Sequence, residues 1–332
     1  MNSPAGRMAV TFMPDLRPHL HISREQLETL KISTEDAVRS VETLLKGVRN
    51  GTVWSAPKAV IQPPDGRYMM ATLCAADQPP YMAVKALLLN PKNRDRGLKD
   101  IQSVVTLLAS DTGLPVATMD GNWVTEIRTA AISAFAAKNL ARSDSEITSF
   151  IGCGIQAHQH LRALVEMFPL REIRAFGRGS ANRDSLCLLA ESMGLKAVAS
   201  TSAESAILGS DIVVSTVTLS QDMEPFVNPK WLKEGSFACI TDLGGPWMKQ
   251  PKTAFDRIFV DDLAQESKMT RPMVDLTQVT GDLLDLADPE FIGRRTNEEK
   301  SAFFFRGIGL GDLAIAALAF EKFRHQGRTV SQ

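Results

Sequence analysis

The sequence predicts an α/β fold of two modules, an α+β module followed by a doubly wound parallel sheet with helices on both faces. Two patterns favour this fold class. In the first part of the chain, one amphipathic helix precedes several short apolar runs that are separated by turn residues. Later, short apolar runs alternate with helical segments, which is typical of βαβ units. At 332 residues the chain is long enough for two domains.

The first element is predicted to be a helix in the segment STEDAVRSVETLLKGVRNG. Ser33 or Thr34 is placed to cap its start, and Gly51 ends it. The residues of its apolar stripe recur at helical spacing: Ala37, Val41, Leu44, Leu45 and Val48. The apolar runs that follow are KAVIQ, RYMMATL, MAVKALLL, QSVVTLL and LPVATM. The Pro- and Gly-containing turns between them indicate an antiparallel or mixed sheet.

The second module begins after a helix in WVTEIRTAAISAFAAKNLA, so the boundary falls near residues 125–145. Its expected strands are ITSFIG, EIRAFG, KAVAS, DIVVST, SFACIT and RIFVDD. The last helix, GDLAIAALAFEKFRHQ, is strongly apolar on one side, and we expect it to fold back onto the first module. This makes the first domain discontinuous, with residues 1–125 and 305–332, around a second domain of residues 126–304.

Composition excludes several classes of function. The 37 basic and 38 acidic residues give a net charge of −1, so nothing favours nucleic acid or an anionic membrane as a partner. No apolar run is long enough to cross a bilayer, and we expect a soluble cytoplasmic protein. His158 and His160 do not converge on a helix, and the cysteines are widely spaced, so we expect no metal and reduced, mostly buried thiols. These cysteines are Cys74, Cys153, Cys187 and Cys239.

A glycine-rich turn lies in FIGCGIQAHQHL, between an apolar run and a helical segment. Gly152 suits the tight turn, and Gly154 allows a pyrophosphate to approach the backbone closely. Ala157 replaces the third glycine of GxGxxG and is small enough for helix–sheet packing. Amides at the start of the helix would face the phosphates. A purely structural turn is the alternative, but the strand before it and the helix after it favour a Rossmann-type dinucleotide site.

The end of the next strand bears on the choice of nicotinamide cofactor. The acid that binds a ribose 2′-hydroxyl is expected about 20 residues after the glycines, but Gly177 and then Arg178 stand there. A guanidinium can pair with a 2′-phosphate, and no carboxylate repels it. NADP(H) is therefore favoured, and NAD(H) remains possible. The alternative is that Arg178 is a solvated surface charge.

Together, MDGNWVTEIRTAAISAFAAKNLA, GCGIQA, IRAFGR, SDIVVSTVT and GLGDLAIAALAF, in that order, resemble the ornithine cyclodeaminase/mu-crystallin family. The resemblance spans roughly residues 30 to 325, and its most specific block is DGxxxTxxRTAA joined to GxGxQA. It implies a substrate-binding and dimerisation domain completed by the C-terminal helix, a Rossmann domain for NAD(P)(H), and a homodimer. Members include ornithine cyclodeaminases, cyclic ketimine and pyrroline-2-carboxylate reductases, and alanine dehydrogenases.

The same resemblance implies a substrate site. Lys85 matches the family's substrate lysine, and Arg128 matches the arginine that binds the substrate carboxylate near the cofactor. Lys58 departs from the family, which usually has another arginine there, and lysine lacks the bidentate fork. From the residues alone, Lys85 could instead lie on an edge strand with its ammonium in water. Arg128 could pair with a structural carboxylate instead of a ligand.

The resemblance also implies a set of cofactor-binding residues. Two of them, Thr216 and Thr218, would lie near the nicotinamide ribose. The remaining cofactor residues are Arg128, Thr129, Gly152, Gly154, Ile155, Gln156, Ala157 and Arg178.

The catalytic aspartate of the cyclodeaminases has no clear counterpart. A gap-free alignment puts Gly244 at that position, with Asp242 two residues earlier. Asp242 follows a predicted strand at its C-terminal end, where α/β sheets bind ligands, but it could equally cap the following glycine turn. Phe305 stands where relatives often have a serine, and Asp312 is expected to cap the last helix.

These features predict an NAD(P)-dependent enzyme that acts on a small amino or cyclic imino acid. We expect reduction of a ketimine or pyrroline-2-carboxylate type of imine, with Lys85, Arg128 and Lys58 holding the carboxylate. The alternative is an ornithine cyclodeaminase that forms proline and ammonia, with Asp242 as its carboxylate. An alternative of another class is a non-catalytic, NADP(H)-dependent protein that binds a small ligand.

Overall fold

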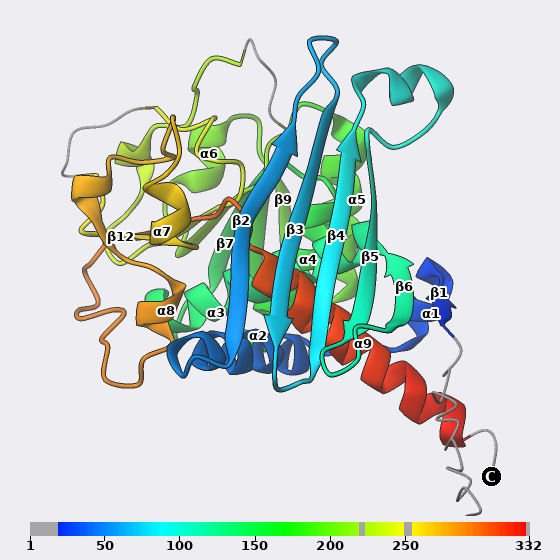
Figure 1. Ribbon diagram of the computed structural model, residues 1–332. Helices are drawn as coiled ribbons and strands as arrows, with labels where there is room; N and C mark the ends of the chain where they lie inside the picture. The colour runs from blue at the N-terminus through cyan, green and yellow to red at the C-terminus, as the bar shows by residue number, and fades with distance from the viewer. Residues whose placement is uncertain (1–18, 219–222, 249–253, 330–332) are drawn as a thin grey trace, which may run out of the picture.

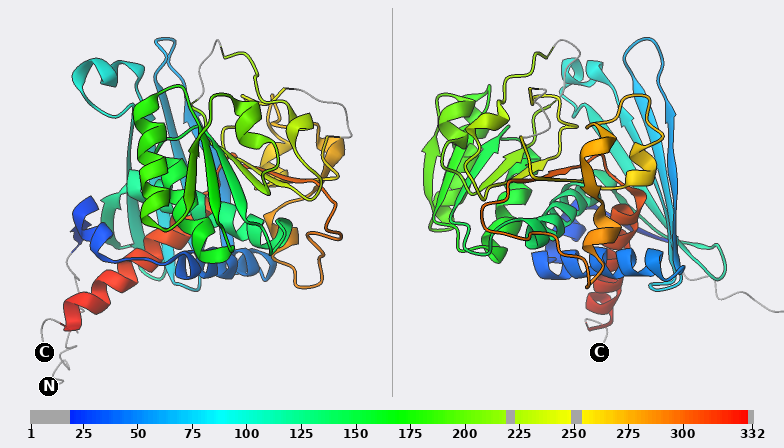
Figure 2. Two further views of the ribbon diagram at one scale, coloured as in Figure 1. Left: turned by 180° about the vertical axis from the view of Figure 1, so that it is seen from behind. Right: turned by 90° about the vertical axis from the view of Figure 1, so that its left-hand side faces the viewer.

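The computed structural model describes residues 19–218, 223–248 and 254–329 (Figure 1). It contains a six-stranded sheet and an eight-stranded sheet. The two sheets lie on opposite sides of the molecule, with helices α3 (Gly121–Leu140) and α9 (Gly309–Thr329) between them (Figure 2). The predicted α/β fold class is confirmed.

The first sheet is mixed, as the sequence predicts. Its strand order is β1-β6-β5-β4-β3-β2, and all neighbours are antiparallel except β1 and β6. The strands are β1 (Leu20–Ile22), β2 (Val53–Ile61), β3 (Tyr68–Ala76), β4 (Tyr81–Leu89), β5 (Ile101–Ala109) and β6 (Pro115–Asp120). Strand β1 was not predicted, because three residues are too few for alternation to be seen. Short helical segments join these strands: α1 (Arg24–Thr29) and the 3₁₀ turn η1 (Pro91–Arg96).

Helices α3 and α9, together with a third helix, pack against the inner face of this sheet. Helix α2 (Thr34–Arg49) begins as expected, because the Oγ of Ser33 accepts a hydrogen bond from the backbone N of Asp36 at 3.1 Å. Helix α9 packs against β3, β4, β5 and α2. The C-terminal helix therefore completes the first module. The expected boundaries, 1–125 with 305–332 and 126–304, stay a prediction, and α3 spans the first of them.

The second sheet is parallel throughout, in the order β13-β12-β14-β11-β10-β7-β8-β9. Its strands are β7 (Ile147–Ile151), β8 (Glu172–Phe176), β9 (Lys196–Ala199), β10 (Ile212–Ser215), β11 (Phe237–Ile240), β12 (Arg257–Val260), β13 (Val279–Gly281) and β14 (Ser301–Phe304). The helical segments between them are α4 (Ile155–Met167), α5 (Ser180–Ser192), α6 (Ala203–Ile207), η2 (Pro229–Trp231), α7 (Leu263–Glu266), η3 (Leu276–Gln278) and α8 (Leu283–Leu286).

Strands β13 and β14 were not expected from the sequence. Strand β14 enters between β11 and β12, so the chain returns to the middle of the sheet just before α9. This insertion leads residues 305–308 from the C-terminal end of the sheet toward the first module. The last connection between the modules therefore passes through the site described below.

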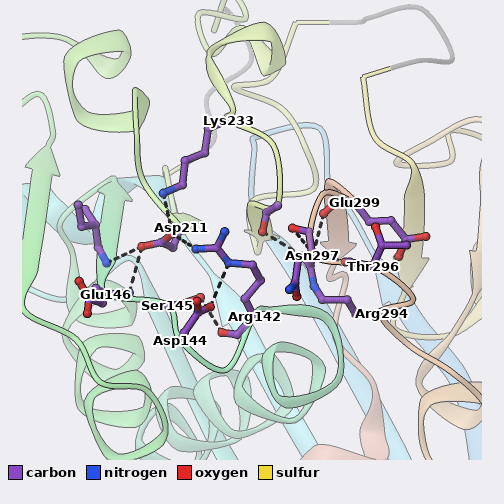
Figure 3. A network of polar contacts seen from close by, with 12 residues as sticks. Arg142, Asp144, Ser145, Glu146, Asp211, Lys233, Arg294, Thr296, Asn297 and Glu299 are labelled. Atoms are coloured by element: carbon purple, nitrogen blue, oxygen red, sulfur yellow. Dashed lines mark hydrogen bonds and ion pairs between the residues drawn. The ribbon is translucent and has the colours of Figure 1, made fainter.

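A polar network braces the opposite, N-terminal ends of the strands (Figure 3). The Asp211 carboxylate accepts a hydrogen bond from the backbone N of Ile147 at 2.9 Å, and it pairs with Arg142 at 2.9 Å and Lys233 at 2.6 Å. Nearby, the Arg294 guanidinium donates to the backbone carbonyl of Leu140 at 2.7 Å. These contacts hold the end of α3 to the starts of β7 and β10, which gives the strands a rigid base.

The sequence predicted no membrane-spanning segment and reduced, mostly buried cysteines. Within the described ranges, no helix combines the length and the apolar character needed to span a membrane. All cysteines are free thiols, and only Cys187 is partly exposed.

Candidate active site

The glycine-rich turn links β7 to α4. Gly152 has a φ of +91°, and a Cβ there would lie 2.7 Å from the backbone oxygen of Thr216. Only glycine fits that position. Gly154 is the N-cap of α4, its side-chain position faces open space among the described residues, and none of their side chains caps the helix. Ala157 is fully buried against the sheet. Uncapped amides and open space fit a phosphate group at this helix start.

A cavity of about 570 Å³ opens at the C-terminal ends of β7, β8 and β10. Strands β8 and β9 lie on one side of β7, and the chain then crosses back to place β10 on the other side, so this is the switch point of the sheet. Predicted cofactor residues that line it are Gly152, Gly154, Arg178, Thr216 and Thr218. Asn182 lines it too, and sequence reasoning did not single it out. The adenosine half of a dinucleotide fits this position.

Lys85 lies on the inner face of β4 and is 1% exposed. Its Nζ donates to Asp312 Oδ1 at 2.6 Å and to Thr125 Oγ1 at 3.3 Å. Strand β4 is flanked on both sides, so the edge-strand interpretation of Lys85 is wrong. Burial and the nearby Arg128 together lower the pKa of Lys85 to about 8, against the opposing effect of Asp312.

Asp312 does not cap the last helix, because α9 begins at Gly309 and Asp312 lies within its first turn. From there its carboxylate turns toward the sheet and accepts a hydrogen bond from Thr72 Oγ1 at 2.8 Å. The Nε of Arg128 lies 2.9 Å from Oδ1. Burial alone would raise the pKa of Asp312, but Lys85 and Arg128 outweigh it and hold the pKa below its ordinary value.

Arg128 reaches this cluster from α3. Its guanidinium carbon lies 5.3 Å from the centre of the Phe305 ring, a cation–π distance. Its buried Nη1 has no hydrogen-bond partner among the described residues. A Cβ added at Gly307 would lie 2.9 Å from this atom. Arg128 therefore forms an ion pair with a structural carboxylate, while its unpaired Nη1 is available to a ligand, so the substrate-binding interpretation stays a prediction.

Lys58 approaches the same point from β2. Its Nζ donates to the backbone oxygen of Arg306 at 2.8 Å and lies 3.4 Å from the Cβ position of Gly307. Burial lowers its pKa to about 8, although Asp261 opposes the shift. Lys58, Lys85 and Arg128 thus converge, and a group of partly desolvated cations is a ready site for an anion.

Thr125 joins the cation cluster to the glycine-rich turn. Besides its contact with Lys85, its backbone oxygen accepts hydrogen bonds from Thr129 Oγ1 at 2.7 Å and from Gln156 Nε2 at 3.4 Å. Gln156 lies in the first turn of α4, beside the exposed Ile155. Sequence reasoning gave Thr125 no role, although it is the threonine of the DGxxxTxxRTAA block.

Asp242 follows β11 and is 3% exposed. Ser215 Oγ donates to its Oδ2, and the backbone N of Val217 donates to the same oxygen at 3.0 Å. Burial raises its pKa above the ordinary value. These bonds hold the loop after β10, which carries Thr216. Within the described chain, no hydrogen bond joins Asp242 to the cation cluster, and its catalytic role stays a prediction.

Sequence reasoning missed Asp261, which follows β12. Its Oδ2 accepts hydrogen bonds from the backbone N of Arg306, at 3.0 Å, and of Gly307. The Arg306 side chain forms a two-point ion pair with the buried Glu266 on α7, at 2.7 and 2.9 Å. A signal was available, because Asp261 ends a predicted strand where parallel sheets bind ligands.

Known proteins share this architecture. A model of the ornithine cyclodeaminase/mu-crystallin family, whose known relatives include alanine dehydrogenases and imine reductases, matches residues 19–327. An alanine dehydrogenase of Archaeoglobus fulgidus is 29% identical over 318 residues, which cover 91% of this chain and 94% of that protein.

Two solved structures match at 26% identity. One is the Δ1-pyrroline-2-carboxylate reductase of Thermococcus litoralis in complex with NADH and L-proline, with a TM-score of 0.84 over 93% of this chain and 98% of that one. The other is an archaeal alanine dehydrogenase dimer with bound NAD, with a TM-score of 0.83 over 93% and 97%. The chain belongs to the ornithine cyclodeaminase/mu-crystallin family.

Proposed function

We propose that this protein is an NAD(P)-dependent reductase of a small α-imino acid, with a cyclic ketimine or pyrroline-2-carboxylate type of substrate. One observation carries the proposal: Lys58, Lys85 and Arg128 converge beside the turn at Gly307, which leaves the C-terminal end of the nucleotide-binding sheet. The relative that reduces pyrroline-2-carboxylate, with NADH and L-proline bound, supports the same substrate class.

The substrate carboxylate would bind between Arg128 and Lys58. Asp312 already balances Lys85, so the charge left for a ligand comes mainly from the other two side chains. The unpaired Nη1 of Arg128 supplies one strong donor, and a charge-assisted contact of this kind stabilises binding by roughly 1.5–3 kcal/mol. Two such contacts fix the imine carbon relative to the cofactor, and orientation supplies much of the acceleration.

Lys85 is suited to handle a proton at the imine nitrogen. Its ammonium has three donors, of which two are used by Asp312 and Thr125. Its pKa of about 8 lets it exist in both protonation states near neutral pH. The bound nicotinamide would supply the hydride, and a protonated imine is the better acceptor for it.

The arrangement favours reduction over cyclodeamination. Cyclodeamination of ornithine requires a carboxylate near the side-chain amine of the substrate. The Asp312 carboxylate already accepts hydrogen bonds from Lys85 and Thr72. The buried Asp242 carboxylate accepts one from the backbone N of Val217 in the loop after β10.

For the cofactor we propose a preference for NADP(H), with NAD(H) as the alternative that the relatives' bound NAD and NADH favour. Arg178 lines the cavity at the end of β8 and forms no ion pair within the described residues. It is therefore available for a 2′-phosphate.

We further propose a homodimer formed through the outer face of the six-stranded sheet. Within the part of the chain that the structure describes, helices cover only the inner face (Figure 2). The outer face exposes a group of large apolar side chains, which is typical of an interface: Trp54, Ile61, Met69, Leu73, Met82, Leu88 and Val104. One relative is described as a dimer.

The test is a panel of cyclic imines, keto acids with ammonia, and amino acids, followed by NAD(P)H absorbance. Proline formation from ornithine is measured separately, because cyclodeamination regenerates its cofactor and leaves absorbance unchanged. We expect NADPH oxidation with at least one imine. Proline from ornithine without imine reduction would establish the cyclodeaminase instead, and ligand binding without any turnover would establish a binding protein.

A further inference from the structure

Asp261 and Lys58 contact opposite ends of one peptide group. The peptide joins residues 306 and 307: its carbonyl oxygen accepts a hydrogen bond from Lys58 Nζ at 2.8 Å, and its N–H donates to Asp261 Oδ2. Asp261 comes from the end of β12 and Lys58 from β2, so the anion and the cation belong to different sheets. A peptide held between a carboxylate and an ammonium is polarised by both, which strengthens each hydrogen bond.

This peptide has no freedom to move away. Gly307 has a φ of +97°, and a Cβ there would lie 2.9 Å from Nη1 of Arg128. The Oδ2 of Asp261 also accepts the N–H of Arg306 at 3.0 Å, which fixes the turn at two consecutive amides. The second oxygen of Asp261, Oδ1, is buried and has no hydrogen-bond partner within the described chain. A buried carboxylate with a bare oxygen is costly, and a nearby cation offsets the cost.

We propose that Asp261 is a positioning residue, which keeps Lys58 protonated and aimed at the substrate carboxylate by acting across the peptide between residues 306 and 307. The inference rests on the proposed function for the role of Lys58. It also concerns a feature of this chain, since an arginine in place of Lys58 would stay charged without help.

The charges around Lys58 make the direction of the effect clear. Asp261 and Asp312 favour its protonated form, while burial, Arg128 and Arg306 oppose it, and the resulting pKa is about 8. Lys85 also lies within electrostatic reach of Lys58. Asp261 is influenced by Lys58 and by Asp262. Removing the charge of Asp261 must therefore lower the pKa of Lys58.

Asp261→Asn is the variant of choice, because asparagine keeps an oxygen for both amides and removes only the charge. We expect the alkaline midpoint of the kcat/KM profile to move down by about one pH unit, with KM for the imine rising more than kcat falls. In a Lys58→Arg background, Asp261→Asn should not move the alkaline midpoint of kcat/KM, because arginine stays charged without the help of Asp261. Asp262→Asn is the matched control, since it removes a neighbouring charge and keeps the cap of α7. It should not move the alkaline midpoint of kcat/KM downward.

A second measurement does not depend on turnover. The rate at which trace acetic anhydride acetylates Lys58, followed by mass spectrometry across pH, reports its protonation directly. We expect this titration to move down in Asp261→Asn and not in Asp262→Asn. If Asp261→Asn does not fold, Lys58→Met tests the coupling from the other side. It should raise the pKa of Asp261, visible in the infrared band of the protonated carboxyl.

The outcomes separate the two proposals. Equal shifts in the Lys58 and Lys58→Arg backgrounds, or no shift in the acetylation titration, would overturn the role of Asp261. A downward shift in acetylation, together with no turnover of any imine, would leave the coupled pair in place and refute the proposed function.

Discussion

Replacing Arg128 with lysine removes the geometry of the proposed carboxylate site and keeps its charge. In the wild type, Nε of Arg128 lies 2.9 Å from Asp312, while the buried Nη1 has no partner in the described structure. Lysine lacks the planar fork with which Arg128 can direct one nitrogen at Asp312 and another at a substrate. Because Asp312 keeps Lys85 and Thr72 as partners, the substrate contact is the one that suffers.

The expected loss follows from one charge-assisted hydrogen bond. Such a bond contributes roughly 1.5–3 kcal/mol, which corresponds to about 10- to 150-fold in kcat/KM. The stacking on Phe305 changes less, because lysine also interacts with an aromatic face. If the contact orients the imine in the transition state, kcat falls and KM rises together.

The assay pairs steady-state kinetics with thermal melting and with NADPH affinity, since Arg128 lies close to the expected cofactor site. Arg24→Lys is the matched control. Arg24, on α1, makes a two-point ion pair at 2.9 and 2.7 Å with Glu126, which lies on the same helix as Arg128 but away from the cation cluster. The control should lower the melting temperature without changing kcat/KM. Turnover of every imine at the wild-type rate by Arg128→Lys would refute the carboxylate site, and an unfolded variant would show that Arg128 serves a structural ion pair.

Three further predictions concern the cofactor site and pH. Arg178→Ala should weaken NADPH binding by about 10- to 100-fold and leave NADH binding almost unchanged in fluorescence titrations, and equal effects on both cofactors would contradict the assignment. Gly152→Ala should abolish cofactor binding, because its Cβ would lie 2.7 Å from the backbone oxygen of Thr216 at a φ of +91°; unchanged binding in the same titration would exclude this turn as the phosphate site. Burial raises the pKa of Asp261 to about 6, against roughly 3.9 when unfolded, so its stabilising contribution is complete below about pH 4 and is lost as pH rises through 6. The melting temperature of Asp261→Asn relative to the wild type should therefore rise between pH 4 and pH 8, and a constant difference would refute the raised pKa.

Local patterns in the sequence were sufficient for most of the fold. The cap at Ser33, the apolar stripe of α2 and the alternation of the long strands depend on neighbouring residues, so each can be read without knowing the rest of the chain. The same holds for the turn at Gly152, where a strand, a glycine and a helix follow one another directly. Strand β14 has four residues and shows no period of its own, so its place in the centre of the sheet was not predictable.

The candidate site is different, because it depends on contacts between distant segments. Sequence motifs pointed to Lys85 and Arg128, but they could not show that both side chains form ion pairs with Asp312 of the last helix. The sequence suggested only a helix cap for Asp312. Nor could they join Lys58 to Asp261, since the two residues are on separate sheets and share only a peptide group that lies far from both of them in sequence. The sequence by itself determined which charged residues the chain carries and on which elements they lie. Their pairing, burial and unpaired donors were decided by tertiary packing, because the packing alone sets which charges lose water and which partner each of them finds.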